Sequence, residues 1–318
     1  MKTTFPAKSK DHQEKIKEIA DIIVKIGKDK IAFVILFGSF ARGNWVYHTY
    51  QEDGIIYNYA SDYDILVITK AKKDARFRSA YRLEDKIKKE INNKFLDKKH
   101  SVTLIIESLD KVNSELEKDR YFFSDIKKEG ILLYSSGEFE LSKPKKLSEA
   151  ERKNIAKEDY NHWFKSGNDF LITANFSSNQ NILNQSAFLL HQATESFYHC
   201  TLLVLTGYKH KTHDLEELNK LCSSHSSKFL TIFPKCNNKL IKIKDGRHFS
   251  LDKSQLETLY KSQDKADWYA LLKIAYIEAR YNKDYKINKE QLEYLIKRVG
   301  ALQGVVEEVC RQRIKLVG

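Results

Sequence analysis

Hydrophobic positions in the first half of the chain follow two different periods. Apolar runs at residues 31–37 and 65–68 are too short for helices and predict buried strands. Residues 8–27 repeat apolar side chains at helical spacing, which predicts an amphipathic helix, and residues 74–99 predict a second one. The remaining elements expected here are strands at 102–106 and 131–134 and short helices at 113–117 and 121–128. This order predicts a small mixed sheet with helices on one face.

The second half of the chain is almost free of strand signals. Ser148 and Glu151 have the spacing of a capping box and predict a helix start after a Ser- and Lys-rich linker, while Gly207 is placed to end a later helix. Helical periodicity covers residues 149–174, 180–205, 213–222, 256–281 and 289–314. We therefore predict an α+β protein with a mixed-sheet domain at residues 1–140 and an all-α bundle at residues 148–318.

Charge and cysteine content narrow the class of protein. The 318-residue chain carries a net charge of +12, and residues 1–147 and the remainder each contribute +6, which argues against a nucleic-acid-binding tail. No apolar run has the length of a membrane span, so no membrane partner is expected. The four cysteines show no metal-ligand spacing and are expected to be free thiols in a reducing cytoplasm: Cys200, Cys222, Cys236 and Cys310.

The candidate chemistry lies where the predicted strands end. Gly38 and Ser39 follow the first strand, and a glycine there lets the backbone approach a phosphate closely. Asp62 and Asp64 precede the next apolar run and project from the same face, because side chains alternate along a strand. Paired carboxylates hold hard cations such as Mg²⁺, which also bind nucleotide phosphates. The combination predicts metal-dependent nucleotidyl transfer.

This arrangement resembles the nucleotidyltransferase superfamily of DNA polymerase beta, and within it the minimal nucleotidyltransferases of bacteria. The matching residues are Gly38, Ser39, Ala41, Arg42 and Gly43, followed by Ser61, Asp62, Tyr63 and Asp64. The resemblance implies that Asp62 and Asp64 are catalytic and bind Mg²⁺ or Mn²⁺. It further implies that Gly38 and Ser39 grip the triphosphate of an NTP, with ATP expected, and that Arg42 neutralises charge or orders the loop.

The sequence departs from the superfamily pattern in two ways. Residues 44–60 form an insertion that predicts a hairpin, whose aromatic side chains either stack on a base or sugar or pack the insertion itself. Active members resemble one another in a third carboxylate on a later strand, and the matching position here is Thr103. Glu107 lies four residues further, about 13 Å along a strand. Catalysis would then be slow, use His100 or the substrate as base, or be absent.

The helical half resembles the HEPN domain, which is often fused to or paired with minimal nucleotidyltransferases. The matching residues are 187–195, 212–215 and 275–281, within a region of about 148–310. The resemblance implies a homodimer through the helical domain. Ribonuclease members carry an Arg followed four to six residues later by His, but Arg280 has no such histidine, and Tyr285 is a poor substitute because its ordinary pKa is near 10. Related toxin–antitoxin pairs imply instead that Tyr285 or Tyr281 accepts a nucleotide, with Arg280 beside it.

Three histidines of the second half receive separate interpretations. His191 stands in an apolar run and is expected to be a hydrogen-bonded core residue, while His213 is expected to make a cap or loop contact. His248 lies in an irregular stretch from which it could reach a ligand.

The leading hypothesis is a metal-dependent nucleotidyltransferase that moves a nucleoside monophosphate from an NTP to a hydroxyl of a small molecule or a protein tyrosine. Two alternatives stay open at this point. One is a catalytically weak or silent nucleotide sensor of toxin–antitoxin type, and the other is an RNA-binding HEPN effector.

Overall fold

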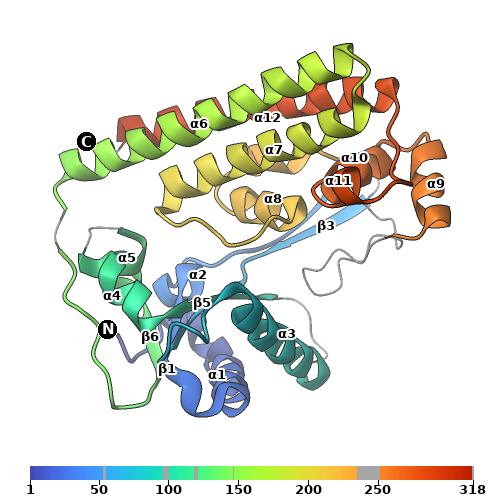
Figure 1. Cartoon of the computed structure of the whole chain (residues 1–318). Coiled ribbons are helices and arrows are strands. Elements are labelled where there is room, and N and C mark those ends of the chain that lie inside the picture. Colours follow the sequence, from blue (N-terminus) through green and yellow to red (C-terminus); the bar gives the residue numbers. More distant parts are fainter. Residues whose placement is uncertain (53–54, 96–99, 118–120, 146, 235–250, 317–318) are drawn as a thin grey trace. The chain divides into compact units, whose positions relative to one another are not determined.

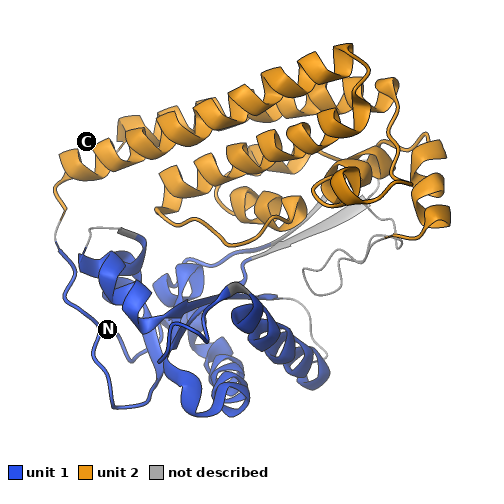
Figure 2. Cartoon of the chain, viewed as in Figure 1, with its two compact units in different colours: residues 1–146 blue, residues 147–318 orange. Residues whose placement is uncertain are grey.

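A computed structural model describes residues 1–318 except 53–54, 96–99, 118–120, 146, 235–250 and 317–318 (Figure 1). The chain divides into two compact units, residues 1–146 and residues 147–318 (Figure 2). No helix in the described part of the chain combines the length and the apolar composition needed to cross a membrane.

The first unit is built around a four-stranded sheet. Its elements are η1 (Ala7–His12), α1 (Gln13–Gly27), η2 (Lys28–Lys30), β1 (Ile31–Phe37), α2 (Gly38–Arg42), β2 (Tyr47–Glu52), β3 (Ile55–Ala60), β4 (Tyr63–Thr69), α3 (Phe77–Lys94), β5 (Val102–Ser108), α4 (Leu109–Glu117), α5 (Tyr121–Glu129) and β6 (Ile131–Ser135). The strand order is β5–β4–β1–β6. Strand β1 is antiparallel to β4 and β6, whereas β4 and β5 are parallel, so the predicted mixed sheet is confirmed.

Both faces of this sheet are covered. Val34 and Val67 lie in the core that includes α1 and α3. Ile35 and Leu66 point to the opposite face, because side chains alternate along a strand, and they are buried as well. Helix α4 contacts β4 and β5, and α5 contacts β1 (Figure 1). The prediction of helices on one face is therefore wrong, because strands that are apolar on both sides need cover on both.

The insertion between β1 and β4 forms the predicted hairpin. Strands β2 and β3 pair antiparallel from Tyr47 opposite Ala60 to Glu52 opposite Ile55. The side chains of residues 48–60 lie outside the described part, so the roles predicted for the aromatic residues there remain predictions. Trp45, which precedes the hairpin, stacks on Phe40 with ring centroids 5.0 Å apart.

The second unit is helical throughout its described part. Its elements are α6 (Glu149–Asn179), α7 (Leu183–Thr206), α8 (Leu215–Ser223), η3 (Ser227–Thr231), α9 (Lys253–Lys261), α10 (Lys265–Ile274), α11 (Glu278–Tyr281) and α12 (Lys289–Leu316). Helices α6, α7 and α12 pack together and share one apolar core (Figure 1). The fold class predicted from the sequence, a mixed-sheet region followed by helices, is confirmed.

Local signals explain where several of these helices begin and end. The Ser148 hydroxyl and the Glu151 carboxylate make the predicted capping box at the start of α6. Gly207, with φ of 72°, ends α7 in the left-handed conformation, as predicted. The single helix predicted at 256–281 is wrong: it is three helices, because the Asp264 carboxylate accepts a hydrogen bond from the Ala266 amide and starts a new helix there.

The cysteines of the described part behave as small apolar residues. Cys200, Cys222 and Cys310 are buried free thiols, as predicted. Burial raises the pKa of the Cys222 thiol well above its ordinary value, which keeps that thiol protonated and unreactive. Cys236 lies outside the described residues, as does His248.

Candidate active site

A glycine turn at the end of β1 lies directly against Asp64, one of the two aspartates predicted to bind a metal ion. Phe37, the last residue of β1, pairs with Asp64 on β4. Gly38 then adopts φ of +71°, and a Cβ added to it would lie only 2.1 Å from Oδ2 of Asp64. Any side chain would therefore displace the carboxylate, and a non-glycine residue would also be strained in this conformation. The structure thus brings the turn and Asp64 together, as the sequence hypothesis requires.

Asp62, the other predicted metal ligand, accepts hydrogen bonds from two hydroxyl groups, one on β5 and one just before it. Asp62 lies immediately before β4, and the Thr103 hydroxyl on β5 donates to its Oδ2 over 3.0 Å. The Ser101 hydroxyl donates to Oδ1. This contact follows from strand register, because β5 runs parallel to β4 with Thr103 paired to Asp64. A threonine therefore lies at the site where the superfamily resemblance implies an acid, and it serves as a hydrogen-bond donor to Asp62.

Glu107 is too far along β5 to take that place. It pairs with Ile68, four residues beyond the pair formed by Asp64 and Thr103, and it is buried. At about 3.3 Å per residue the separation along the strand is about 13 Å. The sequence-based argument against Glu107 therefore agrees with the observed register.

An aromatic cluster supports the aspartates from inside the unit. Tyr63, between the two aspartates, is fully buried, and its hydroxyl lies 2.6 Å from Nδ1 of His12. Nδ1 of His100 donates to the Ser61 carbonyl over 2.8 Å. The His100 ring packs edge-on against Phe40, with centroids 5.2 Å apart. Because His100 is buried and engaged in this way, it serves to hold the loop before β4 in place, and it is a poor candidate for the general base.

The rest of the Gly-Ser motif forms a tight turn. The Ser39 carbonyl accepts hydrogen bonds from the amides of Gly43 and Asn44, at 2.8 and 3.1 Å. Gly43 has φ of +78° and ends the short helix α2. Arg42 forms an ion pair with Glu129, 3.8 Å apart, in which both side chains are largely exposed. Arg42 therefore ties the turn to the end of α5, and a charged ligand would have to compete with Glu129 for it.

The donor set of this site fits a magnesium ion that arrives with a nucleotide. No group of three or more His, Cys, Asp or Glu side chains suited to a metal occurs among the residues that the structure describes. Mg²⁺ needs only one or two protein carboxylates when phosphates and water complete its octahedral shell. Asp62 and Asp64 provide hard oxygen ligands of this type, so they are the residues that would hold it.

These features define a class: an α+β domain with two aspartates at the start of an inner strand of a mixed sheet, joined to a helical bundle. Comparison with protein-family models identifies both parts. Residues 14–139 match the family described as polymerase beta, nucleotidyltransferase, and residues 160–309 match the HEPN domain. The two family models match successive parts of the chain, so the predicted resemblance to a polymerase beta-type nucleotidyltransferase domain fused to a HEPN domain is confirmed. A search of curated proteins found no match.

The second site predicted from the sequence consists of Arg280 with Tyr285 or Tyr281. In the structure Tyr285 is buried, whereas Tyr281 is exposed. Tyr285 is fully buried, its hydroxyl donates to the Leu271 carbonyl over 3.1 Å, and burial raises its pKa far above the ordinary value. It is therefore inaccessible as a nucleophile or as an acceptor. Arg280 lies on the surface, with its guanidinium 4.8 Å from the ring of Tyr281, and Tyr281 is 76% exposed. Of the two tyrosines considered from the sequence, only Tyr281 can meet an incoming nucleotide.

A buried charged network in α7 was not predicted. The Glu195 carboxylate lies 2.9 Å from Nδ1 of His213, 3.4 Å from Nε2 of His199 and 3.7 Å from Nε2 of His191. Burial alone would raise the pKa of Glu195, but hydrogen bonds from His199 and His213 bring it well below its ordinary value. The sequence signal was the four-residue spacing of His191, Glu195 and His199, which places all three on one face of a helix.

The two predicted histidine roles fit this network. His191 is a buried core residue whose Nδ1 donates to the Leu272 carbonyl over 3.1 Å, as predicted. His213 makes a loop contact, since it lies just before α8 and binds Glu195, while Asp214 provides the helix cap.

Proposed function

We propose that the first unit transfers a nucleoside monophosphate from a magnesium–NTP complex to a hydroxyl acceptor. The observation that carries this proposal is the contact between the Gly38 turn and Asp64. Phosphate binding requires a backbone without a side chain, and metal binding requires a carboxylate next to that phosphate. The Gly38 turn lies against the Asp64 carboxylate, so closely that a Cβ added to Gly38 would lie 2.1 Å from Oδ2, which supports both requirements being met at one place.

In this reaction the residues of the site would have distinct roles. Asp62 and Asp64 hold the metal–nucleotide complex, and Ser101 and Thr103 fix the orientation of Asp62. Bound magnesium would neutralise charge on the phosphates and on the leaving pyrophosphate. A bond forms between the acceptor oxygen and the α-phosphorus, the bond from that phosphorus to the bridging oxygen breaks, and pyrophosphate leaves. The acceptor proton passes to solvent.

Because Thr103 stands where a third carboxylate is expected, the site lacks a group that could remove the proton of the acceptor, and this affects which acceptor it can use. A third carboxylate would act as the base that removes the acceptor proton, and such a base is typically worth about 10² to 10⁴ in rate. A threonine cannot do this. A phenol, with an ordinary pKa of about 10, loses its proton more readily than an alcohol does. A tyrosine hydroxyl is therefore the favoured acceptor over a sugar or other aliphatic alcohol, and Tyr281 is an exposed tyrosine of this chain that could serve.

The test is nucleotide-dependent labelling of the full chain. Incubation with each of the four NTPs and Mg²⁺, with and without tyrosine-containing peptides, should release pyrophosphate and add one nucleoside monophosphate to a protein or peptide tyrosine. Asp62→Asn and Asp64→Asn should each abolish both signals. Asp85→Asn removes a carboxylate that only pairs with Lys89 on the surface of α3, and it should leave both unchanged. Absence of pyrophosphate release with every NTP and acceptor would refute the proposal.

A catalytically silent nucleotide sensor is the second candidate. It is favoured by the same hydrogen bonds, since both oxygens of Asp62 accept from hydroxyl groups and the third acid is replaced. This candidate predicts that a non-hydrolysable NTP analogue binds in the presence of Mg²⁺, measured by calorimetry, without turnover of NTP. Thr103→Asp separates the two: it should raise pyrophosphate release by at least about tenfold if only the base is missing, and it should have no effect on a true sensor.

A further inference from the structure

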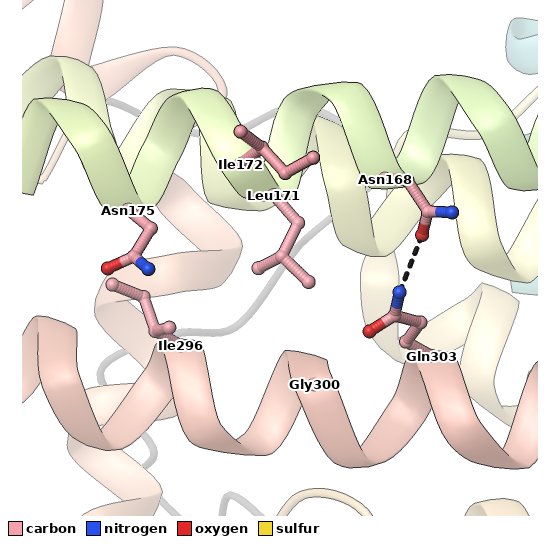
Figure 3. A pocket seen from close by; sticks show the side chains of 7 residues that line it. All are labelled: Asn168, Leu171, Ile172, Asn175, Ile296, Gly300 and Gln303. Carbon is pink, nitrogen blue, oxygen red and sulfur yellow. Dashed lines mark hydrogen bonds between the residues drawn. The ribbon is translucent and has the colours of Figure 1, made fainter.

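A shallow hollow on the surface of the second unit lies between α6 and α12 and has a volume of about 380 Å³ (Figure 3). Its polar lining consists of the neutral amides of Asn168, Asn175 and Gln303, and the Gln303 amide donates to Oδ1 of Asn168 over 2.7 Å. The other side chains that line it are apolar. This hollow therefore presents no ionisable or nucleophilic side chain, whereas the network of histidines around Glu195 does.

His213 is the histidine of this network that a ligand can reach. Its side chain is 48% exposed, whereas His191 and His199, which also lie beside Glu195, are buried. The His213 ring stacks on the Tyr276 ring, with centroids 4.6 Å apart and planes inclined by 15°. The imidazole is therefore held in place along one face and remains open to solvent.

The buried carboxylate of Glu195 decides which nitrogen of His213 is reactive. Burial acts to raise the pKa of Glu195, but hydrogen bonds from His199 and His213 hold it well below its ordinary value, so the carboxylate is ionised and can only accept. Nδ1 of His213, 2.9 Å from Oε1 of Glu195, must then carry a proton. A neutral imidazole has a single ring proton, so Nε2 carries the lone pair. The nucleophilic nitrogen thus lies on the side of the ring away from Glu195.

A positive charge is held on the same aromatic ring. The guanidinium carbon of Arg280 is 4.5 Å from the centre of the Tyr276 ring and 4.7 Å from that of the Phe188 ring. Nε of Arg280 donates to the Tyr276 carbonyl over 2.6 Å. These contacts orient an exposed guanidinium, whose remaining N–H groups suit the oxygens of a phosphate. Tyr276 therefore contacts both the nucleophile, His213, and a group that binds anions.

A histidine nitrogen suits a transfer reaction that lacks a general base. Thr103 cannot remove the proton of an acceptor hydroxyl, as a carboxylate at its position would. A hydroxyl must lose its proton to become a strong nucleophile, whereas the unprotonated nitrogen of a neutral imidazole already has a free lone pair. Transfer to a histidine therefore requires less from the first unit than transfer to a tyrosine.

On the basis of the proposed function, we propose that His213 is a nucleotidylation site, at which Nε2 accepts a nucleoside monophosphate from the NTP bound by the first unit. A bond forms between Nε2 and the α-phosphorus, the bond from that phosphorus to the bridging oxygen breaks, and pyrophosphate leaves. Nδ1 keeps its proton, and the ionised Glu195 carboxylate balances the positive charge that develops on the ring. Arg280 neutralises charge on the transferred phosphate.

The type of bond formed provides the test. A phosphorus–nitrogen bond to histidine is split by mild acid and survives mild alkali, whereas a tyrosine phosphodiester survives both. The full chain, incubated with Mg²⁺ and each NTP labelled at the α-phosphate, should gain label that acid removes. Peptide mapping at alkaline pH should locate that label on His213.

Two matched variants identify the acceptor. His213→Asn keeps a donor near the position of Nδ1 and lacks Nε2, so it should lose the acid-labile label and retain pyrophosphate release with tyrosine-containing peptides. His162→Asn is the control, because His162 is an exposed histidine of α6 that packs against Trp163 with ring centroids 5.2 Å apart. It should change neither signal.

A second measurement does not depend on the activity of the first unit. Phosphoramidate, a small compound that donates phosphoryl groups to histidine nitrogens, should modify His213 of the full chain before it modifies His162. The reason is that Glu195 fixes the reactive form of His213 and Arg280 attracts the anion. The same order should hold in Asp62→Asn. Equal rates at the two histidines would contradict the proposal.

The labelling results separate this proposal from the proposed function. Pyrophosphate release with only acid-stable label would overturn the modification of His213 and leave the proposed function standing. Acid-labile label that persists in His213→Asn, or that falls to the same extent in His162→Asn, would overturn it as well. Absence of pyrophosphate release and of all label would refute both. Circular dichroism shows whether His213→Asn keeps its helices, and peptide mapping of the unaltered chain decides the matter if it does not.

Discussion

The two units use carboxylates in opposite ways. In the first unit, Asp62 and Asp64 lie at the start of β4, an inner strand of the sheet, where both are partly exposed and two neutral hydroxyls donate to Asp62. In the second unit, Glu195 is buried and surrounded by three histidines. The aspartates are accessible to solvent, whereas the Glu195 carboxylate is enclosed by the protein.

Under the proposed function, this difference predicts which carboxylates take part in nucleotide chemistry and which stabilise the fold. A buried carboxylate that already has hydrogen-bonded partners stabilises the fold only as long as all partners remain, because each lost partner leaves an uncompensated buried group. A carboxylate at an exposed edge contributes little to stability and can bind a ligand. Changes at Glu195 should therefore affect unfolding, and changes around Asp62 and Asp64 should affect nucleotide chemistry.

The largest expected effect on stability is that of Glu195→Ala. It removes the shared hydrogen-bond partner of His191, His199 and His213, and leaving a buried polar group without its partner typically costs about 1 to 3 kcal/mol. Chemical denaturation of the full chain, with hydrogen exchange of α7 as a local readout, measures the loss. Glu158→Ala removes an exposed carboxylate of α6 and should change stability by less than about 0.5 kcal/mol. Equal losses in the two variants would contradict a structural role for the network.

Gly38→Ala should lower nucleotide chemistry without unfolding the unit, by less than the loss expected for Asp62→Asn or Asp64→Asn. The added Cβ would displace Oδ2 of Asp64, so we expect pyrophosphate release to fall by about 10²-fold, as a misplaced catalytic group typically does. Gly137→Ala is a close control: Gly137 also has a positive φ, +77°, but its added Cβ meets nothing within 4 Å. Both variants carry similar backbone strain, and only Gly38→Ala adds the clash. If the two lose activity alike, strain and not contact with Asp64 explains the effect.

Local sequence signals were enough for the parts of the fold that depend on neighbouring residues. The apolar runs at β1 and β4, the capping box of Ser148 and the stop at Gly207 were all predictable, because spacing and backbone preference determine them. Thr103 was matched to the third-carboxylate position through the family resemblance, and in the structure it pairs with Asp64 on the neighbouring strand.

Features that depend on distant residues were missed. The coverage of both sheet faces required knowing that α4 and α5 fold back onto β4, β5 and β1. Tyr285 lies in the segment between α11 and α12, and its buried hydroxyl donates to the Leu271 carbonyl, fourteen residues earlier in α10. The partners of Glu195 include His213, which lies beyond the end of α7. A single sequence gives spacing within an element, but it does not say which elements meet.

Acid should weaken the second unit through its histidines. Burial lowers the pKa of His199, and burial together with the charges of His199 and His225 lowers the pKa of His210 to about 3. In the unfolded chain both titrate near pH 6.5, so the unfolded state binds more protons below that pH, and stability present above it is lost as the pH falls. Between pH 7.5 and 5.5 His210 should cost about 1 kcal/mol, and His199 should change stability in the same direction.

The lowered pKa of Glu195 keeps it charged throughout this range, so it should not contribute to the slope. Denaturation midpoints at several pH values test the prediction, and His210→Gln should flatten the dependence by the share of one histidine. Stability that stays constant or rises on acidification would show that the histidines are protonated in the folded state.

The smallest expected effect belongs to Thr103→Val, which keeps the shape of the side chain and removes one hydrogen bond to Asp62. A hydrogen bond to a charged group is worth about 1.5 to 3 kcal/mol at most, and solvent at this partly exposed edge should reduce the loss to about 1 kcal/mol, or about fivefold in the Kd for magnesium–nucleotide. Calorimetry with a non-hydrolysable analogue measures it. On an Asp62→Asn background the same substitution should have a smaller effect, because the charged acceptor is already gone. An undiminished effect there would mean that Thr103 contacts the nucleotide directly, and its hydroxyl would then belong to the binding site itself.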